Sequence, residues 1–289
     1  MIDSDLINRD SRGRDVKSRN EWSMCAQFTL KADVADLGQN FKLRISEELK
    51  TRSWDIRVRG FMKTDLAPVI FANAQGELQL QEMCFSLCPT WSQEFPYKWT
   101  TYNARMNRNK SGPKSASKSA SKQPSSSTSG VEYIYQVPTW REAFQNAWTC
   151  LVPMNAAIES SYFGSEAGNI IQFSQKNNEI FYVAGLYSQW VSQITGEIHD
   201  TFTLLTDDPY PFFFSCGHDR SLIVIAEKDI SSWLQSRSMT PQQRYQFLRD
   251  SRIDLEWQVS LDRHMAKGWE KRKPSQEEIE AIQIWKQSV

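Results

Sequence analysis

The stretch from Asn169 to Leu205, NIIQFSQKNNEIFYVAGLYSQWVSQITGEIHDTFTLL, decides the fold class because it contains three strand-like runs. They are Asn169–Phe173, Ile180–Tyr187 and Thr201–Leu205, each rich in β-branched or aromatic residues. No helical pattern alternates with these runs, so the chain lacks the regular βαβ order of a doubly wound sheet. The stretch therefore predicts strands that pair in a mixed or antiparallel sheet.

Strand-like patterns continue on both sides of this stretch. A turn at Asn73-Ala74-Gln75-Gly76 separates two of them and predicts a hairpin. The further predicted strands are Cys25–Leu30, Asp55–Met62, Ala67–Ala72, Glu77–Leu87, Cys150–Pro153 and Ser221–Ala226.

Helical patterns are scattered among the strands. Thr139–Thr149 has an apolar stripe at Trp140, Ala143, Phe144, Ala147 and Trp148. Other predicted helices are Ile230–Ser236, Pro241–Arg249 (capped by Thr240), Gln276–Gln287 (with a Ser275/Glu278 capping box) and two pieces within 31–53. The sum predicts an α+β fold: a curled, barrel-like mixed or antiparallel sheet flanked by helices.

Composition divides the chain into one domain with appended segments. Residues 1–24 are polar, charged and without periodicity, which predicts a disordered prefix or propeptide. Residues 109–130 are dominated by Ser and Lys and are expected to form a disordered insertion within the domain at 25–265. Residues 266–289 are expected to be a C-terminal helical extension.

Charge and cysteine usage limit the class of protein. The formal net charge is zero, yet residues 103–130 carry six bases and no acid, which can mark a nucleic-acid contact or a solvated basic loop. The five cysteines are odd in number and widely spaced, which argues against a disulfide scaffold or a zinc site. Residues 1–23 do not read as a signal peptide, and no apolar run is long enough to cross a membrane. A reducing cytosol is the expected location.

Four segments place reactive side chains in apolar surroundings. They are Met24-Cys25, Thr101–Arg105, Cys150–Pro153 followed by Glu159, and Gly217–Arg220 with His218. A Cys, a Glu and a His together could supply a nucleophile, a proton shuttle and an acid/base. Each residue taken alone has a structural explanation: Glu159 as an exposed strand residue, His218 as a turn residue bonded to backbone.

In their order and spacing these segments resemble the SRAP (SOS response-associated peptidase) family. The resemblance runs from Met24 to about Arg263 and leaves 109–130 unmatched. It rests on motifs characteristic of the family: Met24-Cys25, Pro89-Thr90-Trp91, Asn103-Ala104-Arg105, Cys150–Pro153 with Glu159, Thr201-Phe202-Thr203 and His218-Asp219-Arg220.

The sequence also departs from the family pattern. The usual Cys-Gly-Arg-aromatic start is Cys25-Ala26-Gln27-Phe28 here, which removes one arginine that could contact a phosphate. Trp-Gly before the Pro-x-Trp segment is replaced by Phe85-Ser86, and the residues around Glu159 have drifted. The chain thus resembles a divergent member, whose rate or substrate preference is expected to differ.

The resemblance implies a DNA-damage-response enzyme that crosslinks covalently to abasic sites in single-stranded DNA, with lyase-like and autopeptidase activity. Cys25 would be the nucleophile, Asn103 would hold its amine or the sugar, and Glu159 and His218 would move protons. Arg105 and Arg220 would contact phosphates, and Trp91 could support a base. No cofactor or metal, no membrane partner and a monomer are expected, in the cytoplasm, on a bacterial nucleoid or in a nucleus.

This mechanism requires Cys25 to become the first residue. Translation could start at Met24, with ordinary removal of that methionine, or the protein could cleave the Met24–Cys25 bond itself. Two other functions remain open at this point: a cysteine-type peptidase, and a protein that binds single-stranded DNA without a covalent bond. The altered Ala26 and Gln27 motivate the second of these.

Overall fold

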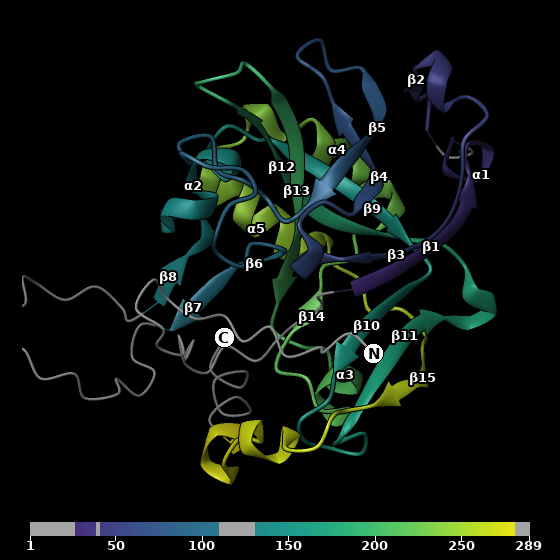
Figure 1. Ribbon diagram of the computed structural model, residues 1–289, viewed down its shortest axis with the longest axis vertical. Coiled ribbons are helices and arrows are strands. Elements are labelled where there is room, and N and C mark those ends of the chain that lie inside the picture. Colours follow the sequence, from purple (N-terminus) through teal and green to yellow (C-terminus); the bar gives the residue numbers. More distant parts are fainter. Residues whose placement is uncertain (1–26, 39–40, 110–130, 281–289) are drawn as a thin grey trace, which may run out of the picture.

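The computed structural model describes residues 27–38, 41–109 and 131–280. The expected prefix 1–24, the reactive Cys25, nearly all of the 109–130 insertion and the end of the C-terminal extension lie outside these residues. Within them, the expected α+β fold is confirmed (Figure 1).

Most of the strands belong to one of two sheets, and two short strands form a separate pair. The larger has the order β14-β13-β12-β9-β4-β5-β2, with β6 beside β13, and the smaller has the order β15-β11-β10-β1-β3. The strands of the larger sheet are β2 (Arg44–Ile45), β4 (Leu66–Ala72), β5 (Leu78–Phe85), β6 (Asn103–Arg105), β9 (Thr149–Met154), β12 (Phe181–Val191), β13 (Ile198–Asp207) and β14 (Ser221–Leu222). Those of the smaller are β1 (Gln27–Asp33), β3 (Ser53–Arg59), β10 (Ala156–Ser160), β11 (Asn169–Gln175) and β15 (Trp257–His264); β7 (Asn107–Asn109) pairs with β8 (Val131–Tyr133).

The larger sheet closes on itself. Strands β13, β12, β9 and β4 are antiparallel neighbours, and β5 then pairs in parallel with β13, with Phe85 opposite Phe202. This five-stranded ring is the curled, barrel-like core that the sequence predicts. Side chains alternate along its strands between two cores: Phe202 and Leu204 pack with Phe28 and Phe85, whereas Leu205 packs toward the helices.

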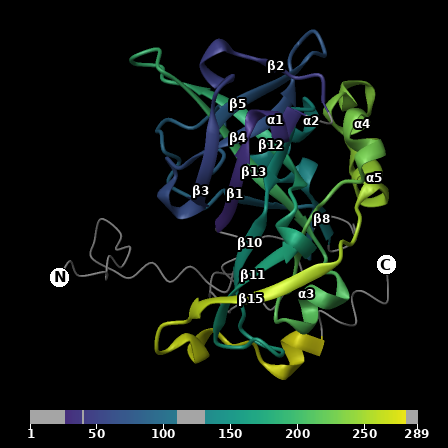
Figure 2. The same cartoon turned by 90° about the vertical axis from the view of Figure 1, so that its right-hand side faces the viewer.

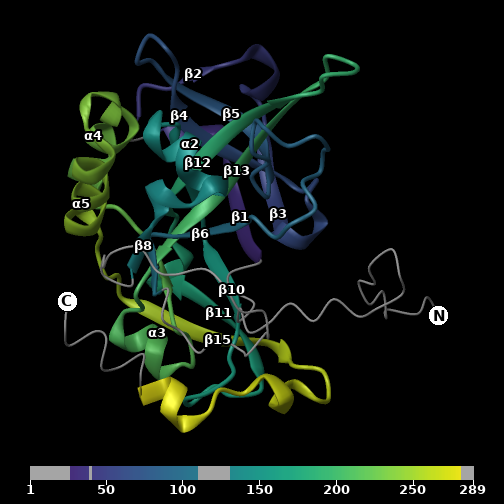
Figure 3. The same cartoon turned by 90° about the vertical axis from the view of Figure 1, so that its left-hand side faces the viewer.

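Short helices cover the ring. α4 and α5 lie along one of its sides (Figures 2 and 3). Thr240 caps α5, as the sequence predicts, and the structure adds a capping box with Gln243. The helices are α1 (Val34–Gly38), α2 (Pro138–Gln145), α3 (Pro211–Ser215), α4 (Ile230–Leu234) and α5 (Pro241–Ser251). Single 3-10 turns occur at η1 (Glu47–Leu49), η2 (Gly60–Met62), η3 (Ile134–Gln136), η4 (Lys176–Asn178), η5 (Glu227–Asp229), η6 (Ser236–Ser238) and η7 (Trp269–Arg272).

Several element boundaries differ from those predicted. The first strand extends to Asp33, so only α1 and η1 remain of the helix expected in two pieces within 31–53. The helix expected over Thr139–Thr149 ends at Gln145, since Thr149 already belongs to strand β9. The strand predicted over Ser221–Ala226 keeps only two ladder residues. In each case tertiary pairing overrides the local apolar pattern.

Candidate functional site

Glu159 lies inside β10, the central strand of the smaller sheet. β10 is flanked by β1 and β11, and Glu159 stands opposite Ile171, which is fully buried. Since side chains alternate along a strand, Glu159 shares the inner face with Ala157. Its residue is only 6% exposed. The interpretation of Glu159 as an exposed strand residue is therefore wrong. A carboxylate buried at this position needs polar or charged groups close to it.

His218, in the loop after α3, is one such polar group. Its Nδ1 lies 3.9 Å from Glu159 Oε2, and its ring meets Phe173 edge-on with a 6.0 Å centroid separation. Among the described residues, the buried Nε2 atom has no hydrogen-bond partner. One ring nitrogen thus faces the glutamate while the other remains available.

Burial controls the ionisation of His218. It lowers the pKa of the imidazole to about 4, and Arg220 lowers it too, whereas Asp219 and a hydrogen bond with the Ser160 backbone oppose the shift. The ring is consequently neutral near pH 7. A neutral imidazole can accept a proton, so this environment favours a general base over a standing acid.

The loop that carries His218 is locked against the end of β10. The buried Ser161 hydroxyl lies within hydrogen-bond distance of the carbonyl oxygens of Phe163 (3.0 Å) and Cys216 (2.5 Å). Gly217 has φ +98°, and a Cβ there would stand 2.0 Å from the Phe163 carbonyl oxygen. Glycine is required at this position both by the backbone conformation and by the contact.

Asn103 and Arg105 approach the same region on β6. This strand pairs in parallel with β13, and Asn103 and Arg105 share one face while Ala104 is buried. The Arg105 guanidinium lies 3.3 Å from an Asp208 oxygen and 3.6 Å from an Asp219 oxygen. Because Asp219 follows His218, this ion pair ties β6 to the His218 loop.

Asp219 connects the two arginines that the sequence assigns to phosphate contacts. Its carboxylate is 3.3 Å from Arg220 Nε and also pairs with Arg105. Burial raises the pKa of Asp219, but Arg220 and Arg105 outweigh it, so the pKa lies below the ordinary value. The sequence analysis missed this role, although Asp219 stands inside the His218-Asp219-Arg220 motif. The carboxylate holds both guanidinium groups in place and leaves part of each exposed.

Two predicted residues remain, Trp91 and Cys25. Trp91 is 52% exposed in the segment between β5 and β6, and its ring packs edge-on against Tyr97. Cys25 lies outside the described residues. The nearest described residue, Gln27, pairs with Ile158, which adjoins Glu159 in β10.

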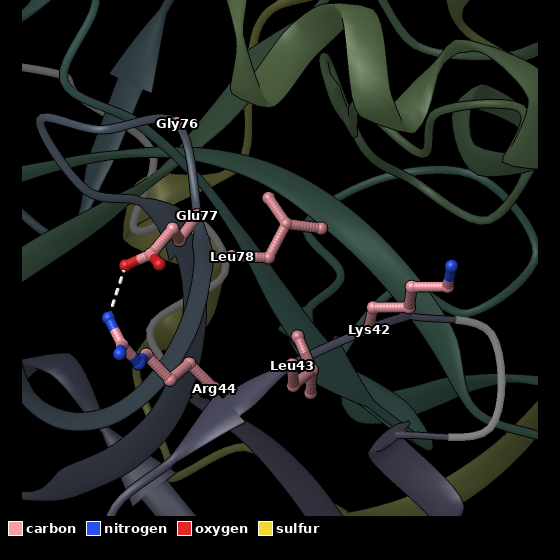
Figure 4. A pocket seen from close by; sticks show the side chains of 6 residues that line it. All are labelled: Lys42, Leu43, Arg44, Gly76, Glu77 and Leu78. Carbon is pink, nitrogen blue, oxygen red and sulfur yellow. Dashed lines mark hydrogen bonds and ion pairs between the residues drawn. The ribbon is translucent and has the colours of Figure 1, made fainter.

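A surface pocket lies elsewhere, at the β2–β5 edge (Figure 4). Arg44 and Glu77 form an ion pair of 2.5 Å there and neutralise each other. Its lining shares no residue with the site, and we assign it no catalytic role. Within the described ranges, no group of three or more metal-ligating side chains is present, and no helix is long and apolar enough to cross a membrane.

A family model for SOS response associated peptidase (SRAP) matches residues 111–261, slightly more than half of the chain. The protein belongs to the SRAP family. The matched residues include Glu159 and His218, whereas Cys25, Asn103 and Arg105 precede them. Membership indicates a function in the DNA-damage response and interaction with DNA.

Solved structures show that this SRAP fold is shared at low sequence identity. A protein from Bordetella bronchiseptica is 16% identical, with a TM-score of 0.60 over 83% of this chain and 100% of that one. A protein from Bacteroides thetaiotaomicron is 19% identical, with a TM-score of 0.61 over 83% and 92%. A phage-related protein from Bordetella bronchiseptica is 12% identical, with a TM-score of 0.54 over 87% and 100%. A comparison with curated protein sequences gave no match.

Proposed function

We propose that this SRAP protein forms a covalent thiazolidine crosslink with abasic sites in single-stranded DNA through Cys25, once residues 1–24 are removed. The observation that carries the proposal is the buried Glu159–His218 pair, with His218 Nε2 lacking a partner among the described residues. A buried histidine and glutamate with an available ring nitrogen suit proton transfer to a bound substrate.

The reaction uses both groups of an N-terminal cysteine. The Cys25 α-amine attacks the aldehyde of the ring-opened sugar, and the carbinolamine loses water to give an imine. The thiol then adds to the imine carbon and its proton goes to the nitrogen, which closes a five-membered ring. An α-amine has a pKa of about 7.7–8, so much of it is nucleophilic near pH 7, whereas a lysine near 10.4 is mostly protonated.

Chain connectivity supports Cys25 as the partner of this pair. Gln27 is held in register beside Ile158, one residue from Glu159. Cys25 stands two positions before Gln27, with Ala26 between them, and two residues of extended chain span at most about 7 Å. This short connection supports Cys25 as the residue that reacts beside Glu159.

The other residues take roles that follow from their positions. Glu159 exchanges protons with the amine and with the departing hydroxyl, and neutral His218 accepts a proton as the sugar ring opens. Asn103 hydrogen-bonds to the amine or the sugar. Arg105 and Arg220 contact the flanking phosphates, preoriented by Asp219.

Two substitutions at Cys25 test the chemistry. With abasic single-stranded DNA, the protein that begins at Cys25 should give an adduct that survives denaturing electrophoresis. Cys25→Ser keeps the amine but loses the thiol, so its adduct should survive only after reduction with borohydride. Cys84→Ser, a half-buried cysteine in β5, serves as the control and should crosslink like the parent protein. A stable adduct in Cys25→Ser without reduction would overturn the thiazolidine.

Self-cleavage of the Met24–Cys25 bond is a second candidate activity, favoured by the internal position of Cys25 in the chain. Cys25 would attack the Met24 carbonyl, and water would then release residues 1–24. His218→Gln should in that case retain residues 1–24 after expression, as measured by intact mass. If His218→Gln still lacks residues 1–24 completely, self-cleavage is contradicted. Cys25 would then become the first residue because translation starts at Met24.

A further inference from the structure

A basic segment follows the last strand and lies beyond the part of the chain that the family model matches. The match ends at residue 261, in β15. The next residues, 262–273, carry five bases and two acids. The bases are all exposed: Arg263, Lys267, Lys271, Arg272 and Lys273.

Specific contacts hold this segment on the loop that leaves Glu159. The Met265 amide donates to the Gly168 carbonyl oxygen at 2.9 Å, and His264 Nδ1 lies 2.9 Å from Asn169 Oδ1. Arg272 Nη1 reaches the Tyr162 hydroxyl at 3.5 Å. Residues 161–169 connect β10 to β11, so the basic segment packs on the loop that leaves the strand carrying Glu159.

Trp269 fixes the position most firmly. Its indole lies on Gly168, where a Cβ would stand 2.8 Å from the ring, and Gly168 has φ +91°. Both the backbone conformation and the ring require glycine here. Figure 2 shows the segment in yellow, below β15 and α3.

The acids in this stretch leave its charge largely uncompensated. Asp262 is held by a bidentate pair with Arg57, at 2.9 and 3.0 Å, and also pairs with Arg263 at 2.5 Å; its pKa is lowered mainly by the hydrogen bond from Arg57. Glu270 remains as the other acid. The lysines at 267, 271 and 273 therefore present positive charge beside the site.

We propose that residues 263–273 are a second DNA-binding surface that contacts the phosphate backbone of the strand flanking the damaged nucleotide. The inference rests on the proposed function for the presence of DNA at Glu159. The positive charge selects a polyanion, and the contacts with Tyr162, Gly168 and Asn169 place it on the β10–β11 loop. Flexible lysines bind phosphates without reading sequence, so the surface should raise affinity for any long strand.

The test neutralises Lys267, Lys271 and Lys273 together by substitution with Gln. Binding to a long undamaged single strand is measured over a range of salt concentrations. Each lost phosphate contact lowers the salt slope by about 0.7, so the slope should fall by about 2 and affinity at physiological salt by about tenfold or more. Lys42→Gln/Lys176→Gln/Lys228→Gln removes the same charge from exposed lysines away from the site and should behave like the parent protein.

A second measurement separates this inference from the proposed function. Crosslinking to a short abasic strand, too short to reach beyond the damaged nucleotide and its neighbours, should be unchanged by the triple substitution. An unchanged salt slope in a variant that still crosslinks would overturn the second surface alone. Absence of any adduct in the parent protein would instead overturn the proposed function.

Discussion

At the scale of single residues, the site depends on how burial changes ordinary side chains. His218 is 4% exposed and its pKa is lowered to about 4, whereas a solvated histidine titrates near 6.5. Motif order predicted that Glu159 and His218 act together, which stays a prediction; the structure places the two side chains 3.9 Å apart. The neutral state of the imidazole could not be predicted, because it arises from the packing of Phe173 and the buried loop around it.

The depressed pKa of His218 predicts a pH dependence of stability. Between about pH 6.5 and 4 the unfolded chain binds a proton that the native imidazole resists, so stability falls as the pH falls through this window. The loss should approach about 2 to 3 kcal/mol across the window. Urea unfolding of the parent protein and of His218→Gln at several pH values measures it. The difference in unfolding free energy between the two proteins should shrink by this amount on acidification. A difference that stays constant would contradict the lowered pKa of His218.

At the scale of elements, the long apolar strands were predictable, whereas the short strands and one half-polar strand were not. β4, β11, β12 and β13 lie within a few residues of their predicted positions. β15 was missed although Trp257, Val259 and Leu261 alternate with polar residues, which is the pattern of a half-buried strand. Its place beside β11 comes from pairing with a strand distant in the chain.

Gly217 links an element to the site and can be tested. Gly217→Ala forces a side chain into the left-handed region and against the Phe163 carbonyl oxygen, so unfolding should become easier by about 2 to 4 kcal/mol. Crosslinking should also slow, since the His218 loop must move. Gly196→Ala is the control: φ is +73° with no atom within 4 Å, so only about 1 kcal/mol should be lost. An equal loss of unfolding free energy in the two variants would contradict the role of Gly217 in fixing the His218 loop.

A second prediction at this scale concerns the connection between β7 and β8. Asn109 stands opposite Val131, so residues 110–130 leave and re-enter the fold at neighbouring positions. An Asn-Gly turn in their place should close a two-residue hairpin, with stability unchanged or raised by up to about 2 kcal/mol because the loop is shorter. Thermal and urea unfolding measure this. A large loss of stability would show that the insertion contributes to the fold.

At the scale of the whole molecule, the class of fold was predictable and its closure was not. A barrel-like α+β core follows from many strands without βαβ order. The parallel pairing of Cys84 and Phe85 with Thr201 and Phe202, which closes the ring, joins segments more than a hundred residues apart and leaves no local signal. The β6–β13 pairing brings Arg105 to 3.6 Å from Asp219, and the loop that carries Asp219 places His218 3.9 Å from Glu159.

The central claim, that a chain beginning at Cys25 forms the crosslink, is tested most directly by intact mass spectrometry. The protein is incubated with abasic single-stranded DNA, denatured and weighed. We expect one adduct whose mass equals residues 25–289 plus the oligonucleotide less one water, and no adduct with Cys25→Ala. An adduct whose protein part still begins at Met1, or no adduct from a protein shown to begin at Cys25, would contradict it.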